Sequence, residues 1–360
     1  MTAPARIRGW CPSLFRPMES GDGWLARIRP ERGRLPSALL RKVADAALRH
    51  GNGILEITNR GNLQVRGLRP ESIAPFTTTM EEAGAAVGEG SRILISPLLG
   101  ADPSLAPDLL ALADEIDRAL PESLSAKFGV LLDGGGALPL SGIVLDLVIR
   151  WTGADWAVNG KAVARDAIAT HIRERATGLA RVSERAGHPP KLGRHAGFLL
   201  LAPAFGQMRA EALLTLADLA ETHGDGALRP TPWKSIALAG VAWDQAPTVL
   251  QAAEKRGFIT DRNDGRLSLI TCAGAPACAR GEIATHDAAS ALAASRRAGD
   301  GLLHLSGCVK GCAHPGAAPV TLVGRAGQID LVRHGKAADT PAFRGLSLAE
   351  IPATMQSLPA

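Results

Sequence analysis

The fold is decided by residues 36–67, which read PSALLRKVADAALRHGNGILEITNRGNLQVRG. In the first half of this stretch, apolar residues recur with the spacing of one face of an amphipathic helix, and Pro36 suits the first turn of that helix. Gly51 and Gly53 follow the last apolar position, where glycine commonly ends a helix. The pattern therefore predicts a helix over residues 36–49.

The second half of the stretch predicts a β-hairpin. The runs 54–58 and 63–66 have β-type composition, and they flank Arg60-Gly61-Asn62, which is a turn signal. A further extended run, 24–29, precedes the helix. Together these segments predict a β-α-β-β unit, which is half of a ferredoxin-like α+β sandwich.

The same pattern returns 173 residues later, in residues 197–241. Ten positions are identical between the two copies: Gly33/Gly206, Leu40/Leu213, Ala44/Ala217, Asp45/Asp218, Ala47/Ala220, His50/His223, Gly51/Gly224, Gly53/Gly226, Thr58/Thr231 and Gly67/Gly240. Composition bias does not account for the matches, because His, Asp and Thr are among them. We therefore predict two half-modules whose sheets pair around a pseudo-two-fold axis.

Composition and charge restrict the function classes. The 360 residues are 46% hydrophobic and 21% charged, which supports a sizeable core and excludes wholesale disorder. The apolar runs are far shorter than a membrane span, and no apolar signal-peptide region precedes Cys11. The net charge of +5 suits an anionic ligand, but no basic run with interleaved aromatic residues indicates nucleic-acid binding. We therefore expect a cytoplasmic protein that binds neither membrane nor nucleic acid.

The cysteines are the strongest chemical signal. Four of the five follow the pattern C-x5-C, 29 intervening residues, C-x3-C: Cys272, Cys278, Cys308 and Cys312. Four thiolates can hold a [4Fe–4S] cluster or a structural zinc ion. Zinc sites usually have two to four residues between paired ligands, so the pattern favours the cluster, with zinc as the alternative. Cys11 stands apart as either a further ligand or, more in keeping with its isolation, a small buried residue.

At this point the chain resembles the sulfite and nitrite reductase superfamily, in which a [4Fe–4S] cluster adjoins sirohaem. The cysteine spacing carries the resemblance, together with four motifs in order: Leu25–Arg29, Leu55–Gly67, Ser91–Leu94 and Lys127–Gly129. The resemblance implies that one set of residues binds the carboxylates of a tetrapyrrole: Arg27, Arg29, Thr58, Arg60, Asn62, Gln64, Arg66, Arg92 and Lys127. In the second copy Leu200, Ala202 and Ala237 replace Arg27, Arg29 and Gln64, so the first copy is expected to line the site.

Two residues depart from the reductase pattern, which favours another branch of the superfamily. Gly129 stands where the reductases have a second lysine, and Gly61 replaces the Gln that follows the hairpin arginine. The segments Gly9–Ser13, Pro17-Met18 and Gly21–Gly23 resemble instead the opening of the precorrin-3B synthase family, the cobalamin-pathway branch of the superfamily. That resemblance implies a monooxygenase that hydroxylates precorrin-3A and closes a γ-lactone. The alternatives are a sirohaem-dependent nitrite or sulfite reductase and a non-catalytic tetrapyrrole or Fe–S carrier.

The resemblance also implies the domain order and the cofactors. The half-modules would be residues 1–75, with an N-terminal arm, and 191–245. The reductase-type α/β domains would be residues 76–190 and 246–360, the latter carrying the [4Fe–4S] cluster. A mononuclear non-haem iron is a further expected cofactor, with His314 as its candidate ligand; sirohaem is expected only under the reductase alternative. Precorrin-3A and dioxygen would be the substrates, and an external ferredoxin or reductase would deliver NAD(P)H electrons. No residue is assigned a catalytic role.

Overall fold

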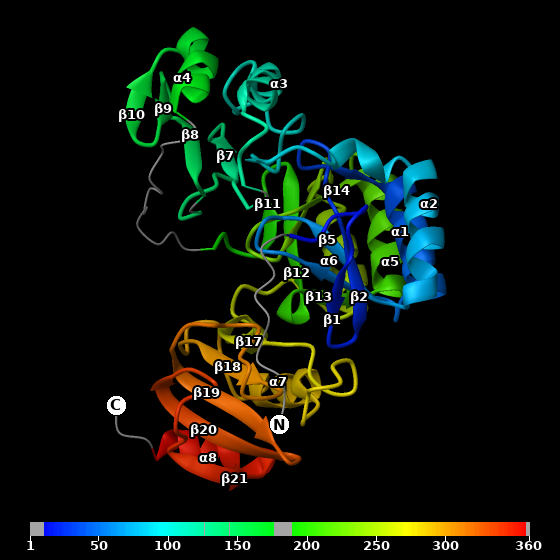
Figure 1. Ribbon diagram of the computed structural model, residues 1–360, viewed down its shortest axis with the longest axis vertical. Helices are drawn as coiled ribbons and strands as arrows, with labels where there is room; N and C mark the ends of the chain where they lie inside the picture. Colours follow the sequence, from blue (N-terminus) through cyan, green and yellow to red (C-terminus); the bar gives the residue numbers. More distant parts are fainter. Residues whose placement is uncertain (1–10, 126, 144, 176–188, 358–360) are drawn as a thin grey trace. The chain divides into compact units, whose positions relative to one another are not determined.

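The computed structural model describes residues 11–125, 127–143, 145–175 and 189–357. The chain divides into two compact units (Figure 1). The described part of the large unit comprises residues 11–18 and the described residues from 25 to 258; that of the cysteine unit comprises residues 19–24 and 259–357. None of the helices in these residues is both long and apolar enough to cross a membrane.

The predicted β-α-β-β unit is confirmed in both copies. The first copy consists of β2 (Gly23–Ile28), α1 (Ser37–His50), β4 (Ile54–Ile57) and β5 (Leu63–Leu68). The second copy consists of β12 (Phe198–Pro203), α5 (Ala210–His223), β14 (Ala227–Pro230) and β15 (Ile236–Ala239). In each copy the last two strands form an antiparallel hairpin, with Leu55 opposite Val65 in the first.

The two copies exchange short strands. The five-stranded sheet of the first copy has the order β1-β2-β5-β4-β13, where β1 is Met18–Ser20 and β13 is Gln207–Arg209 from the second copy. The six-stranded sheet of the second copy has β11-β12-β15-β14-β3, with β16 also paired to β12; here β3, Leu35–Pro36, comes from the first copy. The other two strands are β11 (Gly193–His195) and β16 (Phe258–Ile259). This reciprocal pairing closes both sheets around a pseudo-two-fold axis.

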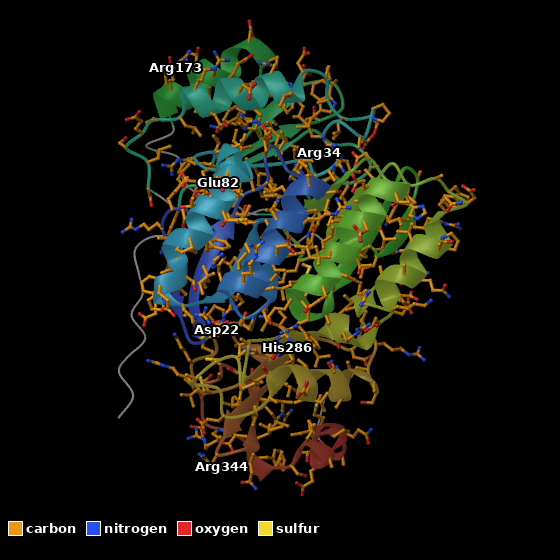
Figure 2. The ribbon with its side chains drawn as sticks, turned by 90° about the vertical axis from the view of Figure 1, so that its right-hand side faces the viewer. Asp22, Arg34, Glu82, Arg173, His286 and Arg344 are labelled. Atoms are coloured by element: carbon orange, nitrogen blue, oxygen red, sulfur yellow. The ribbon has the colours of Figure 1, made fainter. Side chains whose placement is uncertain are left out.

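A layer of helices packs on these sheets in the order α2 (Ile73–Glu82), α1, α5 and α6 (Ala246–Glu254). Figure 2 shows α1 and α5 running side by side. The apolar face that the sequence predicts for α1 is buried, since Leu40 and Val43 are almost completely excluded from solvent. Leu213 and Leu216 of α5 are equally buried, so the helix pair forms the centre of the core.

The large unit also contains a mixed sheet of order β10-β9-β8-β7-β6. Its strands are β6 (Ile93–Ile95), β7 (Val130–Asp133), β8 (Leu147–Trp151), β9 (Trp156–Val158) and β10 (Lys161–Val163). Strands β6, β7 and β8 pair in parallel, whereas β9 pairs antiparallel with β8 and β10 antiparallel with β9. Helices α3 (Leu109–Ala119) and α4 (Ile168–Arg175) pack against each other, and both contribute to the core of this sheet.

The cysteine unit repeats this topology. Its sheet has the order β17-β18-β19-β20-β21, again with three parallel strands followed by two antiparallel ones. The elements are β17 (Leu269–Thr271), α7 (Thr285–Ala293), β18 (Leu303–Ser306), β19 (Ala318–Arg325), β20 (Gln328–Gly335), β21 (Phe343–Leu346) and α8 (Ile351–Gln356). The chain therefore carries a second structural repeat, which the sequence analysis did not detect.

Candidate functional site

The large unit contains a pocket of about 230 Å³ lined by arginines of the predicted set. Arg27 comes from β2 and Arg29 directly follows that strand, whereas Arg60 lies in the turn between β4 and β5 and Arg92 directly precedes β6. Pockets for whole drug-sized ligands measure about 300–1,000 Å³. This pocket is smaller than that, and its size suits a charged substituent or edge of a larger anionic ligand.

The arginines of the pocket repel one another. Burial lowers the pKa of Arg27, and the neighbouring positive charges of Arg29 and Arg60 lower it further, while Cys11 raises it. Arg27 is held by Gln64, whose Oε1 accepts from Nε at 3.1 Å and from Nη2 at 2.6 Å. Like charges fixed this close favour an anionic ligand, because each carboxylate bound there relieves the repulsion.

Arg29 and Arg92 are positioned by backbone carbonyls. Arg29 Nη1 donates to Ser91 O at 2.7 Å, and its Nε is buried without a hydrogen-bond partner. Arg92 donates to Ser125 O at 2.5 Å and to Leu124 O at 3.3 Å. Within the described part of the chain, neither guanidinium lies within 4 Å of a carboxylate oxygen, so both are available to an anionic ligand.

The hairpin turn is shaped by Thr58. Its Oγ1 accepts from the backbone N–H groups of Arg60 and Asn62, at 3.2 and 3.1 Å, which fixes the turn that presents Arg60. Gly61 has φ 64°, and a Cβ at this position would lie 2.8 Å from Pro230 O of the second copy. Glycine is thus required here both by the left-handed backbone and by close packing. Asn62 lines the pocket directly.

Gly129, the departure from the reductase pattern, makes room for Arg60. Arg60 Nη2 donates to the carbonyl oxygen of Lys127 at 2.9 Å. A Cβ at residue 129 would lie 3.1 Å from Arg60 Nη1 and 3.3 Å from Leu145 Cδ2. A side chain at residue 129 would therefore require the Arg60 guanidinium to shift from this position.

Four residues of the predicted set are not part of the pocket lining: Thr58, Gln64, Arg66 and Lys127. Arg66 forms an ion pair with Glu56 at 2.7 Å, and Glu56 also accepts from Gln64 Nε2 at 3.4 Å. Lys127 contributes its backbone carbonyl to Arg60, while its side chain is exposed. Arg66 therefore supports the hairpin through Glu56, whereas Arg27, Arg29, Arg60 and Arg92 form the charged wall.

Cys11 and Glu89 complete this region, and the sequence analysis gave neither of them a role in it. Cys11 is half-buried and lines the pocket beside Arg27. Glu89 lies behind Arg29 and bonds to the backbone of Leu14 and the side chain of Ser13. Burial raises the pKa of the Glu89 carboxyl, although Arg29 opposes this effect. Its neighbours Gly88 and Gly90 line the pocket, but no motif in the sequence pointed to Glu89.

Glu89→Gln is expected to change how stability depends on pH. The pKa of the Glu89 carboxyl is higher in the folded protein than its ordinary value of about 4.5. The protonated carboxyl therefore stabilises the fold below pH about 4.5, and this stabilisation is lost as the pH rises through the raised pKa. The variant lacks this titration, so its melting temperature should rise relative to the wild type between pH 4.5 and neutrality. Glu82→Gln, at an exposed position on α2 (Figure 2), is the control. If the melting temperatures of the wild type and Glu89→Gln change with pH in the same way, the raised pKa of Glu89 is contradicted.

The four predicted cysteines converge in the cysteine unit. Cys272 follows β17 directly and Cys308 follows β18 by one residue, so both lie at the carboxyl ends of parallel strands. Burial raises the pKa of Cys312, and the neighbouring Cys272, Cys308 and Cys278 raise it further, which shows that the four thiols share one environment. The Gly307 N–H donates to Cys272 Sγ at 3.2 Å.

The surroundings of these thiols fit a [4Fe–4S] cluster. A Cβ at Gly21 would overlap Cys278 Sγ, and a Cβ at Gly307 would lie 3.2 Å from Gly274 Cα, so glycine allows close packing at both positions. No three His, Cys, Asp or Glu side chains of the described residues lie close enough to hold a single metal ion. A zinc ion needs its four ligands at one centre, whereas a cluster binds each thiolate to a separate iron. The preference for a cluster over zinc stays a prediction from the cysteine spacing.

The other α/β sheet has a related corner without thiols. Gly134 follows β7 as Gly307 follows β18, and its N–H donates to Ser96 Oγ at 2.8 Å. Ser96 follows β6 as Cys272 follows β17. The two hydrogen bonds occupy equivalent places in the repeated topology, so one α/β domain has cysteine where the other has serine.

His314, the candidate iron ligand, lies beside a second histidine. Its ring centroid is 5.6 Å from that of His304, at an interplanar angle of 70°. His304 is completely buried on β18, and neither ring nitrogen has a hydrogen-bond partner. Burial, with a smaller contribution from His314, lowers the pKa of His304 to about 4. The sequence analysis did not identify His304, because a single His within an apolar run is usually a buried core residue without a functional role.

Comparisons with known proteins define the class of the protein. Residues 16–83 and 194–256, which contain the two copies, match the nitrite/sulfite reductase ferredoxin-like half domain. The structure of NirA from Mycobacterium tuberculosis has a related fold, with a TM-score of 0.59, 16% sequence identity, and coverage of 92% of this chain and 79% of that one. The protein is thus of the nitrite and sulfite reductase fold class.

Curated relatives identify the family within this class. A precorrin-3B synthase from Sinorhizobium sp is 32% identical in an alignment of 393 positions, which covers 94% of this chain and 86% of the relative. A ferredoxin–nitrite reductase from Synechococcus elongatus is 26% identical, over 88% of this chain and 78% of its own. The chain belongs to the precorrin-3B synthase family, whose members are oxidoreductases.

Proposed function

We propose that the protein hydroxylates precorrin-3A at C-20 and closes a γ-lactone from a ring acetate, which gives precorrin-3B. One atom of dioxygen enters the product as the hydroxyl oxygen. The other atom is reduced to water by two electrons and two protons. The electrons come originally from NAD(P)H and reach the protein through an external reductase or ferredoxin. The observation that carries the proposal is the wall of arginines in a chain of this family.

The arginines would bind and orient the substrate through its carboxylates. A guanidinium matches a carboxylate with two parallel hydrogen bonds, and its charge keeps the carboxylate ionised. Arg27 and Arg29 lie on or next to β2, Arg60 on the hairpin turn and Arg92 before β6, so the four would hold separate points along one edge of the ring. An acetate held ionised in this way is a nucleophile that can form the lactone.

The cofactor part of the proposal concerns the cysteine unit. Cys272, Cys278, Cys308 and Cys312 would hold a [4Fe–4S] cluster, which supplies one-electron transfer when bound. The Gly307 N–H already bonds to Cys272 Sγ, and such bonds to sulfur tune the potential of a cluster. A mononuclear iron near His314 is the second proposed metal. Sirohaem is no part of this function.

The test is turnover by anaerobically purified protein. We expect a broad Fe–S absorption without a sirohaem Soret band, and conversion of precorrin-3A only when dioxygen and a reductant are both supplied. With ¹⁸O₂, one labelled oxygen should appear in the new hydroxyl. Stoichiometric sirohaem with consumption of nitrite or sulfite would establish the reductase alternative, which the 26% identical relative represents. Tetrapyrrole binding without any turnover would indicate a carrier.

A further inference from the structure

We propose that Glu89 is a positioning residue of the arginine pocket, and that it takes up a proton when a ligand carboxylate binds to Arg29. Glu89 is not part of the pocket lining, whereas its neighbours Gly88 and Gly90 belong to it. The proposed function assigns no role to this carboxyl. The inference rests on that function in one respect, namely that carboxylates are the ligands of the pocket.

The segment that carries Glu89 packs directly on Arg29. A Cβ at Gly88 would overlap the carbonyl oxygen of Arg29, so glycine is what allows the two backbones to lie this close. The same segment continues to Ser91, whose carbonyl oxygen accepts a hydrogen bond from Arg29 Nη1 at 2.7 Å. The residues on both sides of Glu89 therefore fix the position of Arg29.

Two buried polar atoms in this region lack a partner, and they are of opposite character. Glu89 Oε1 is an acceptor and Arg29 Nε is a donor, and neither forms a hydrogen bond within the described part of the chain. The carboxyl and the guanidinium are thus neighbours that do not bond to each other through these atoms. An ionised carboxylate is costly to bury with an unpaired oxygen, and a proton on the carboxyl removes that cost.

The charged groups that face Glu89 decide when the proton binds. Burial raises the pKa of the Glu89 carboxyl, and Arg29, hydrogen bonds from Leu14 and Ser13, and more weakly Arg27 act against this rise. The N-terminal segment contributes hydrogen bonds and no charge, so among the described residues the charges acting on Glu89 are the two arginines. A ligand carboxylate bound to Arg29 offsets the positive charge that favours ionised Glu89. The pKa of Glu89 then rises further, and a proton binds.

Ligand binding and protonation of Glu89 should therefore favour each other. A ligand that raises the pKa of Glu89 binds more tightly to the protonated form, so its affinity should fall as the pH rises through the pKa of the free protein. Each pKa unit of difference corresponds to an affinity difference of about tenfold between the two forms. Glutamine at residue 89 has nearly the shape of the protonated carboxyl and does not ionise. Glu89→Gln should therefore keep the low-pH affinity of the wild type at every pH.

The experiment is anaerobic titration calorimetry of the full-length protein with precorrin-3A, from about pH 5.5 to 7.5, above the ordinary pKa of carboxyl groups. Each titration is repeated in two buffers of different ionisation enthalpy, because the difference in heat gives the number of protons bound per ligand. We expect the wild type to take up as much as one proton and its Kd to rise about threefold or more over this range. Glu89→Gln should lose both effects. Glu82→Gln, at an exposed position on α2, is the matched control and should behave as the wild type.

A second variant keeps the test decisive if Glu89→Gln does not fold. Ser13→Ala removes a hydrogen bond that favours the ionised carboxyl, so proton uptake should move to higher pH. Unchanged uptake in Glu89→Gln, or uptake at the same pH in Ser13→Ala as in the wild type, would overturn the proposal.

The calorimetry also separates this inference from the proposed function. If the wild type binds precorrin-3A, Arg60→Ala weakens that binding, and no proton is taken up, then the arginine pocket stands and the role of Glu89 alone is overturned. If the wild type binds no precorrin-3A at any pH, the pocket assignment and the role of Glu89 are both overturned.

Discussion

A Cys308→Ser variant, purified anaerobically, is expected to contain less than a tenth of the acid-labile sulfide of the wild type. The loss should be this large because the four thiols share one environment, and a cluster that lacks one thiolate leaves an iron open to solvent and oxidation. Serine is nearly isosteric with cysteine, so the fold around β18 should be disturbed little. Iron and sulfide analysis, with the visible spectrum, measures the effect.

Cys11→Ser is the control for this experiment. Cys11 belongs to the large unit and lines the arginine pocket, so its replacement should leave iron and sulfide unchanged. Retention of a full cluster in Cys308→Ser would contradict the ligand assignment. Stoichiometric zinc without sulfide in the wild type would replace the cluster with a zinc site.

Arg60→Ala is expected to weaken the binding of precorrin-3A by roughly ten- to hundredfold. This corresponds to about 1.5–3 kcal/mol, the usual contribution of a hydrogen bond to a charged group. Arg60 Nη2 is held by the Lys127 carbonyl, and Gly129 leaves the space that its guanidinium occupies. The dissociation constant is measured anaerobically by absorbance titration, so that turnover does not interfere.

Arg173→Ala provides the matched comparison. Arg173, labelled in Figure 2, lies exposed on α4, where its Nη2 contacts Thr170 Oγ1 at 3.3 Å, and it is not part of the arginine pocket. Removing the same charge there should change affinity less than twofold. Equal, small losses at both positions would show that the net charge of the protein attracts the substrate and that the pocket does not bind it.

Local sequence was enough to predict the elements of each copy. The α1 helix follows from apolar spacing and glycine stops within 18 residues, and the hairpin around Arg60 follows from β-type runs and a turn signal. These are short-range preferences of the backbone, which depend little on the rest of the chain. The exchange of β3 and β13 between the copies could not be predicted this way, because strands of two and three residues carry no periodicity.

By itself, then, the sequence determined the internal repeat, the set of four cysteines and the arginine-bearing motifs, since each is written in residue types and spacings. Only the tertiary structure decided which of these arginines face a ligand. It turned Arg66 toward Glu56, gave Arg60 the space at Gly129, and brought Cys11 beside Arg27. It also placed His314 beside an unsatisfied His304, ten positions earlier in the chain. The reason is that partnership between side chains depends on long-range packing, in which residues distant in sequence compete for the same volume and the same hydrogen bonds.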